Sequence, residues 1–228
     1  MKSRYVCLSH TLKNTMPCYN GNRNINITNA QSLKNGDTVN SITMTLENHV
    51  GTHMDFPKHF YEDGMSLDDY EPEHFIFEKV RVIDIPLDSG IVISAEMVAN
   101  ASGCCTDNIC DFLIVRTGYG LYYNQSSYWN DNPGLSLDAA EYIKRSFTNL
   151  KAIGVDFISI NAYKNKAEGR KAHMKLLEKP SVVIIEDMKL LGLEAGTRQI
   201  KRIIAAPLQV SQADGVPCTI YAEFDIKE

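Results

Sequence analysis

The sequence has no long apolar run and no surplus of positive charge. Its 228 residues carry 23 Lys and Arg against 28 Asp and Glu, a net charge of −5. Proteins that bind nucleic acid present basic surfaces to the phosphate backbone, so we expect no nucleic-acid partner. A membrane-spanning helix needs about 20 consecutive apolar residues, and no window approaches that length. We therefore expect no membrane partner either.

The sequence also has few cysteines, and they are not spaced for metal binding. None of the six forms a C-x-x-C pair, which structural zinc sites commonly use. Residues 1–14 contain no uninterrupted apolar segment of the kind found in signal peptides. We therefore predict a cytoplasmic protein with reduced thiols. The cysteines are Cys7, Cys18, Cys104, Cys105, Cys110 and Cys218.

Short apolar runs outnumber helical patterns along the chain. Repeats and linker-like segments are absent, so one domain over residues 1–228 is the simplest prediction. Because strands outnumber helices and are interleaved with them, we predict a strand-rich α/β domain with a mixed sheet. The expected strands are residues 4–8, 40–46, 79–85, 112–116, 150–155, 182–185, 203–206 and 219–224.

Three segments have helical patterns. Ser136 can cap a helix that ends near residue 147, and Ser94 can cap a shorter one through residue 101. Residues 166–177 carry charges on most sides and end before Pro180, which indicates a surface helix. Its inward side is expected at positions 172 and 176.

Chemistry is concentrated in residues 49–59, which hold three of the six histidines and one aspartate. If residues 53–55 are extended, His53 and Asp55 lie on one face, because strand side chains alternate. His49 can join them if the chain turns at Gly51, where no side chain blocks a close approach. Two imidazoles and a carboxylate suit Zn²⁺, Mn²⁺ or Fe²⁺ and leave positions for water. An exposed polar loop remains the alternative. His10 and His74 stand apart, and we expect structural roles for both.

The second half adds two candidates. His173 lies in the segment with a helical pattern, and Glu186 ends the apolar run at residues 182–185. A carboxylate at the end of a buried strand is costly unless it is paired or bound to a cation. Glu186 can equally mark the point where the strand returns to solvent.

The motif around residues 49–59 resembles H-x-G-T-H-x-D-x-P-x-H, the motif of the cyclase family of metal-dependent hydrolases, which includes bacterial kynurenine formamidase and isatin hydrolase. Segments along nearly the whole chain are similar in order. They are residues 8–10, 114–119, 154–156 with Ser159, His173 with 176–177, Glu186, 207–208 and 214–217.

The resemblance implies roles for six residues. His49, His53 and Asp55 would bind one divalent metal ion, Zn or Mn, and Asp55 would bridge to a second. The second ion would be held by His173 and Glu186, although some relatives bind one ion only. His59 would be the general acid/base. The resemblance also implies a swivelling β/β/α fold and a homodimer or homotetramer.

The implied activity is hydrolysis of a C–N amide bond in a small molecule, as in an arylformamidase of tryptophan catabolism. The chain departs from formamidases at residues 19–22, where Tyr-Asn-Gly-Asn replaces an aromatic-Pro-Gly-Asp run that helps to form the substrate pocket. We therefore expect an altered, more polar pocket. Two alternatives remain: a cyclic-amide hydrolase similar to isatin hydrolase, and a non-catalytic metal-binding homologue.

Overall fold

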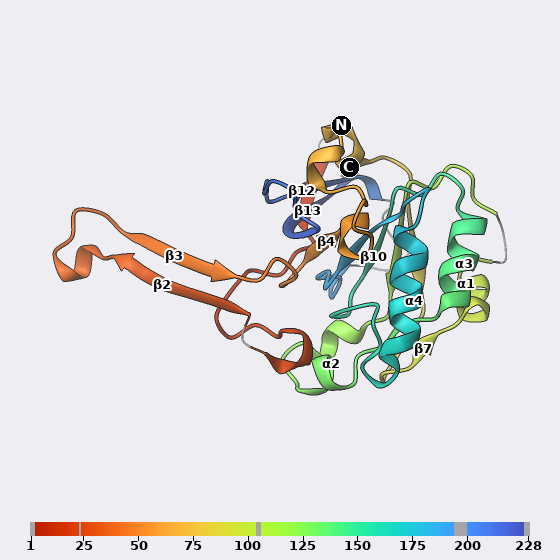
Figure 1. Ribbon diagram of the computed structural model, residues 1–228, viewed down its shortest axis with the longest axis horizontal. Helices are drawn as coiled ribbons and strands as arrows, with labels where there is room; N and C mark the ends of the chain where they lie inside the picture. Colours follow the sequence, from red (N-terminus) through yellow and green to blue (C-terminus); the bar gives the residue numbers. More distant parts are fainter. Residues whose placement is uncertain (1–2, 23, 104–105, 194–199, 226–228) are drawn as a thin grey trace.

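A mixed, twisted sheet forms the centre of the computed structural model, which describes residues 3–22, 24–103, 106–193 and 200–225 (Figure 1). The strand order is β5-β12-β13-β4-β11-β10-β8-β6, and β1 pairs with β13. The predicted strand-rich α/β class with a mixed sheet is confirmed. The bounds are β1 Ser3–Cys7, β4 His53–Asp55, β5 Ile76–Phe77, β6 Val80–Asp84, β8 Phe112–Arg116, β10 Ala152–Val155, β11 Val183–Glu186, β12 Ile200–Pro207 and β13 Gly215–Asp225.

The sheet combines a parallel half with an antiparallel half. Strands β6, β8, β10 and β11 run parallel, whereas β4 is antiparallel to both β11 and β13. Parallel strands are usually covered on both faces. In β8, Leu113 and Val115 face the core beneath the helices, and Phe112 and Ile114 face the core beneath the long antiparallel strands. This explains why β8 reads as a continuous apolar run.

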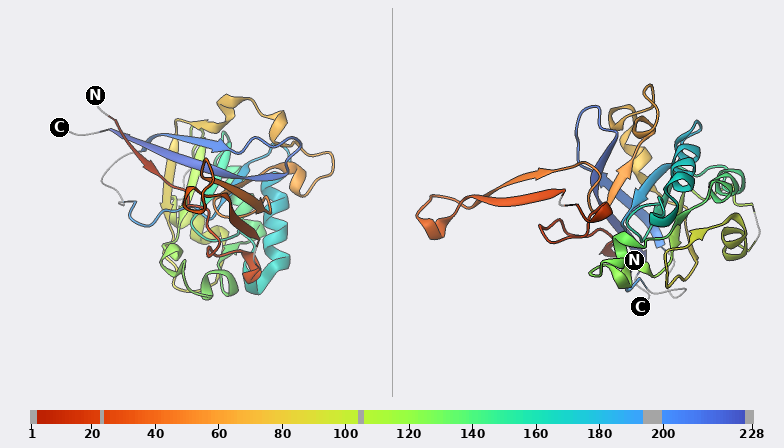
Figure 2. Two further views of the ribbon diagram at one scale, coloured as in Figure 1. Left: turned by 90° about the vertical axis from the view of Figure 1, so that its left-hand side faces the viewer. Right: turned by 60° about the horizontal axis from the view of Figure 1, so that its bottom comes forward.

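The helices cover one face of the parallel half (Figures 1 and 2). The predicted caps are confirmed, because Ser136 accepts a hydrogen bond from the Ala139 N–H and Ser94 accepts one from the Met97 N–H. Helix α4 has the predicted bounds, and Ala172 and Leu176 are fully buried. Among the described residues, every helix is too short or too polar to cross a membrane. The bounds are α1 Ala95–Ala101, α2 Ser127–Asn130, α3 Leu137–Ser146 and α4 Lys166–Leu177.

A two-stranded arm, made of β2 (Ile25–Gln31) and β3 (Ser41–Leu46), extends far from the sheet (Figures 1 and 2). The cross-strand pair Ile27 and Met44 shares one face of the arm with Ile42. Ile42 and Met44 are 58% and 52% exposed, so this apolar face remains uncovered along much of its length. Strand β3 was predicted from sequence and β2 was not. A short parallel pair completes the structure, β7 (Val92–Ile93) with β9 (Gly134–Leu135).

Candidate active site

The candidate site is a cavity of about 310 Å³ where β4, the end of β11 and α4 meet. Strand β4 lies between β11 and β13, and its register places His53 opposite Glu186. Met54 points into the apolar core, so His53 and Asp55 point together into the cavity, as the predicted alternation requires. All six predicted site residues line this cavity.

Four of them form a buried group that we call the inner cluster: His53, Asp55, His173 and Glu186. Each is at most 4% exposed. His53 Nε2 lies 3.4 Å from both Asp55 Oδ1 and Glu186 Oε2. His173 Nε2 lies 3.0 Å from Glu186 Oε1 and 3.7 Å from Asp55 Oδ2. The two oxygens of Asp55 therefore face different imidazoles.

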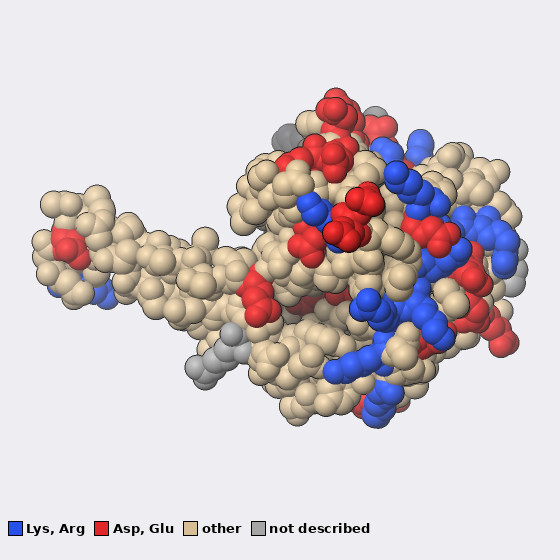
Figure 3. Space-filling model, viewed as in Figure 1, with Lys and Arg blue, Asp and Glu red and all other residues tan. Residues whose placement is uncertain are grey.

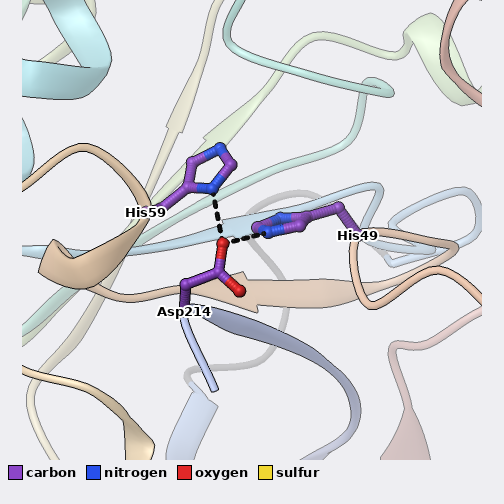
Figure 4. Close-up of side chains that lie close together, drawn as sticks. All are labelled: His49, His59 and Asp214. Carbon is purple, nitrogen blue, oxygen red and sulfur yellow. Dashed lines mark hydrogen bonds and ion pairs between the residues drawn. The ribbon is translucent and has the colours of Figure 1, made fainter. Parts of the chain in front are cut away.

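The outer cluster comprises His49, His59 and Asp214, which are only partly buried (Figure 4). Asp214 Oδ2 lies 2.9 Å from His59 Nδ1 and 3.1 Å from His49 Nε2. The other ring nitrogen of His49, Nδ1, lies 2.8 Å from Asp55 Oδ1, which joins the two clusters. His59 turns its second ring nitrogen away from Asp214.

Backbone groups hold the inner donors in place. The Nδ1 of His53 donates to the Gly51 carbonyl and that of His173 donates to the Gly169 carbonyl, so the Nε2 atom of each ring faces the carboxylates. Glu186 Oε1 accepts from the Ser159 hydroxyl at 3.0 Å and the Ile160 N–H at 2.7 Å. Glu186 is therefore a buried, hydrogen-bonded group, and the open alternative of a solvent-exposed strand end is wrong.

The turn before β4 requires glycine. Gly51 has a φ of 62°, and a Cβ there would lie 2.7 Å from Met16 Cε. The expected turn at Gly51 is confirmed, and it brings His49 back beside Asp55. Residues 57–59 then form the single turn η3 (Pro57–His59), which presents His59 at the cavity.

Electrostatics in the inner cluster are dominated by the two carboxylates. Burial opposes the charged imidazolium of His53, but Asp55 and Glu186 outweigh it and raise the pKa of His53 to about 9. The pKa of His173 is likewise raised to about 9 against burial. Burial raises the pKa of Glu186, and the imidazoles reverse this and lower it to about 2. The carboxylates are thus ionised and attract positive charge.

The donor set fits divalent metal ions. Two groups each place three donor atoms within 4.8 Å of one another, His49 with His53 and Asp55, and Asp55 with His173 and Glu186. Four-coordinate zinc with bonds of about 2.1 Å has donors roughly 3.4 Å apart. Within the two groups, the distance from His53 to Asp55 is 3.4 Å, and the distances from His49 to Asp55, His173 to Glu186 and His173 to Asp55 are 2.8, 3.0 and 3.7 Å. These values lie around the expected separation, and Asp55 belongs to both groups. Imidazole and carboxylate donors without thiolate suit Zn²⁺ and Mn²⁺.

Sequence reasoning missed two acidic residues at the site. Asp214 was assigned no role, although it contacts both His49 and His59. The available signal was the similarity of residues 214–217 to the cyclase family, and in the structure a Cβ on the adjacent Gly215 would lie 2.3 Å from the His49 ring. Asp187 lines the cavity and accepts a hydrogen bond from Tyr128, and burial raises its pKa to about 6.

The cavity mouth contains the segment that departs from formamidases. Tyr19, Asn20 and Asn22 line it, which agrees with the expectation of a polar pocket wall. The Tyr19 hydroxyl and the side-chain Oδ1 of Asn161 are buried here without a hydrogen-bond partner among the described residues.

Residues expected to be structural behave accordingly. His10 stacks on Tyr123 and His74 packs against Tyr70, and burial lowers the pKa of both histidines to about 4. The four described cysteines are free thiols, and all except Cys7 are buried. Cys104 and Cys105 lie outside the described residues.

The sequence matches the Cyclase family model, described as "Putative cyclase", over residues 6–162. The chain belongs to the cyclase family. Among its cyclase-family relatives, the kynurenine formamidase of Bacillus cytotoxicus is 25% identical over 215 residues, which cover 94% of this chain and 95% of the relative. Cyclase-like protein 2 of Arabidopsis thaliana is 25% identical over 216 residues, covering 92% of this chain and 75% of the relative.

Solved structures support the cyclase-family fold. Isatin hydrolase A from Labrenzia aggregata superposes with a TM-score of 0.79 at 20% identity, over 97% of this chain and 93% of that one. A potential metal-dependent hydrolase with cyclase activity superposes with a TM-score of 0.76 at 18% identity, over 99% and 100%. At these identities the likeness extends to the fold alone.

Proposed function

We propose that this cyclase-family protein is a metal-dependent hydrolase that cleaves a C–N amide bond of a small molecule, with a specificity similar to arylformamidase. The observation that carries the proposal is that Asp55 belongs to both groups of metal donors. Its Oδ1 faces His53 and its Oδ2 faces His173. A half-exposed imidazole, His59, stands beside them. Metal donors together with a proton-transfer group are what amide hydrolysis requires.

The proposed ligands follow from the two donor groups. His49, His53 and Asp55 would hold one ion, Zn or Mn, and Asp55, His173 and Glu186 a second. When bound, such an ion lowers the pKa of water to about 7 and polarises a carbonyl group. The carboxylates of Asp55 and Glu186 balance the positive charge in a buried setting, where unpaired charge is costly.

His59 is the proposed general acid/base. Its Nδ1 donates to Asp214, which fixes the ring and leaves Nε2 to exchange a proton with the reacting groups. The His59 side chain is 30% exposed, so it can also exchange that proton with solvent. Hydrolysis of the amide needs one proton delivered to the departing nitrogen, and His59 would supply it.

Two substrate classes are compatible with this chemistry. Kynurenine formamidase, related over almost the full length of both chains, supports an aryl formamide. The isatin hydrolase fold supports a cyclic amide as the second candidate. Purified protein loaded with Zn²⁺ or Mn²⁺ should hydrolyse at least one of N-formylkynurenine, formanilide, isatin or a cyclic imide. Bound metal with no turnover of the whole panel would favour a non-catalytic homologue.

We also propose a homodimer or homotetramer, supported by the uncovered apolar face of the arm. An isolated two-stranded hairpin is marginally stable in water, and exposed apolar strands need a cover. The Ile42→Lys and Met44→Lys double variant should sediment as a smaller species than the wild type. If the wild type sediments as a monomer, at the same rate as the variant, the proposal is contradicted. Cytoplasmic location stays a prediction.

A further inference from the structure

The basic side chains on and beside α4 differ in how they are paired. Three of them form ion pairs with carboxylates: Lys164 with Asp131, Lys171 with Glu168, and Lys175 with Glu178. Lys166 and Arg170 have no carboxylate within ion-pair distance among the described residues. They are four residues apart and therefore lie on the same face of the helix.

Both unpaired cations border the cavity mouth. The Lys166 ammonium donates to Asn20 Oδ1 at 2.8 Å and lies 5.5 Å from the centre of the Tyr19 ring. Asn20 and Tyr19 line the cavity. Tyr163 flanks the same ammonium at 5.1 Å. The aromatic contacts hold Lys166 at the rim without neutralising it.

Arg170 occupies the neighbouring part of the rim. Its guanidinium lies 5.0 Å from the centre of the Phe60 ring, which also lines the cavity. The Phe60 ring lies 5.2 Å from the His173 ring and 4.6 Å from the His59 ring. One aromatic ring therefore separates the Arg170 cation from the inner cluster and from the proposed acid/base.

The charge inside the cavity is of the opposite sign. Among the described residues, its lining contains Glu47, Asp55, Glu186 and Asp187 and no Lys or Arg. Figure 3 shows basic side chains gathered along α4, at one side of a hollow with acidic side chains within it. Bound metal would offset the charge of Asp55 and Glu186 but not that of Glu47 and Asp187, so a negative substituent remote from the metal would be attracted to the basic rim.

The wall below the rim has unused hydrogen-bonding capacity. The Tyr19 hydroxyl and Asn161 Oδ1 are buried and have no partner among the described residues. Buried polar atoms are normally satisfied, but both atoms are covered by neighbouring groups, Asn161 Oδ1 by Gly169 of α4, so they show the polar character of this wall and do not by themselves indicate a ligand. Both atoms belong to residues that line the cavity.

We propose that the substrate carries a carboxylate, remote from the amide that is cleaved, which binds Lys166 and Arg170 at the cavity mouth. This inference rests on the proposed amide hydrolysis and narrows its substrate to N-acyl compounds with an anionic substituent. Both cations would act on binding and would take no part in proton transfer. The guanidinium can bind a carboxylate through two parallel hydrogen bonds, and the ammonium adds a point charge.

The kinetic test compares 3- and 4-formamidobenzoate with their uncharged methyl esters in the metal-loaded protein. Lys166→Met and Arg170→Met remove charge and keep most of the apolar stem, and Lys171→Met, on a paired lysine of the same helix, is the matched control. We expect the double variant to lose about 10- to 100-fold in kcat/KM for the carboxylates, mainly through KM. Turnover of the esters and the behaviour of the control should stay within about twofold of wild type.

A binding measurement separates failure of this inference from failure of the proposed hydrolysis. Benzoate and benzamide are titrated into metal-loaded wild type and variants, with thermal melts to verify folding. We expect benzoate to bind wild type at least about tenfold more tightly than the double variant, and less tightly as salt is raised. If benzoate binds in this way but no amide is hydrolysed, the carboxylate site at the rim is supported and the proposed hydrolase activity is contradicted. If wild type and all variants bind benzoate with equal affinity, the anion binds elsewhere, for example at the metal ion. That result overturns the inference whether or not the esters are hydrolysed.

Discussion

The inner and outer clusters share one cavity but differ in how their residues are held. Side chains of the inner cluster are 1–6% exposed and are fixed by strand register and backbone hydrogen bonds. Those of the outer cluster are 24–36% exposed, and their polar contacts run mainly between one another. Rigid, buried donors suit a bound cation, whereas exposed groups suit contact with substrate and exchange of protons. The difference separates the buried metal donors from the proton-transfer group His59, and His49, a proposed ligand that contacts both Asp55 and Asp214, links the two clusters.

Asp55→Ala should have the largest effect because Asp55 belongs to both donor groups and contacts His49 of the outer cluster. Removing a neighbour of a metal ligand typically costs 10–100-fold in affinity, so loss of this shared ligand should exceed about 100-fold. Elemental analysis should show loss of metal, and activity should fall with it. Full metal occupancy in a folded variant would contradict the assignment of metal binding to the inner cluster.

His59→Ala should separate the two functions. We expect bound metal to remain at the wild-type level while kcat falls by about 10²–10⁴-fold, the range typical of a general acid/base. Elemental analysis and steady-state kinetics on the same preparation would measure both quantities. Turnover equal to wild type would remove His59 from the mechanism, and loss of metal would make it a ligand.

Asp214→Asn tests whether the carboxylate positions His59. The amide keeps the shape of the side chain but holds the imidazole less strongly, since the hydrogen bond from His59 is no longer to a charged acceptor. We expect kcat at saturating metal to fall about 10-fold with KM unchanged, and metal affinity to fall about tenfold as well, because Asp214 also contacts the proposed ligand His49. A selective rise in KM would instead indicate that Asp214 contacts the substrate.

Ser159→Ala should have the smallest effect. Its hydroxyl donates to Glu186, but the Ile160 N–H donates to the same oxygen and would still hold the carboxylate. We expect metal affinity to fall by about tenfold, at the low end for such partners, with kcat at saturating metal unchanged. Competition with a chromophoric chelator would measure the affinity. A loss as large as that of Asp55→Ala would mean that Glu186 depends on Ser159 alone.

Much of the inner cluster was predictable because its signals are local. Alternation within residues 53–55 placed His53 and Asp55 together, and helix α4 followed from charge pattern and the downstream proline. Asp214 was not predictable in this way, because it lies 155 positions from His59 in the sequence. Only the pairing of β13 with β4 brings the two side chains together. The ligand roles themselves came from the family resemblance and stay predictions, as does the single-domain boundary.

The missed strands have physical explanations. Strand β2 alternates Ile with Asn and Thr, and only Ile25 and Ile27 at its start pack on a small apolar cluster, so its composition resembles a polar loop. Strands β5, β7 and β9 each have two residues, too few to show any periodicity. They exist because neighbouring strands supply hydrogen-bond partners, which is information from the tertiary structure.

The arm has a consequence for the cavity. Its two strands leave the body at Asn24 and Glu47, whose backbones are hydrogen-bonded at 2.9 Å and whose side chains line the cavity mouth. Lys34 and Asp37 at the far end are the arm's charged residues, and the shaft between has none. Binding on the arm and entry of substrate therefore meet at the same two residues, Asn24 and Glu47, which end the arm and line the cavity.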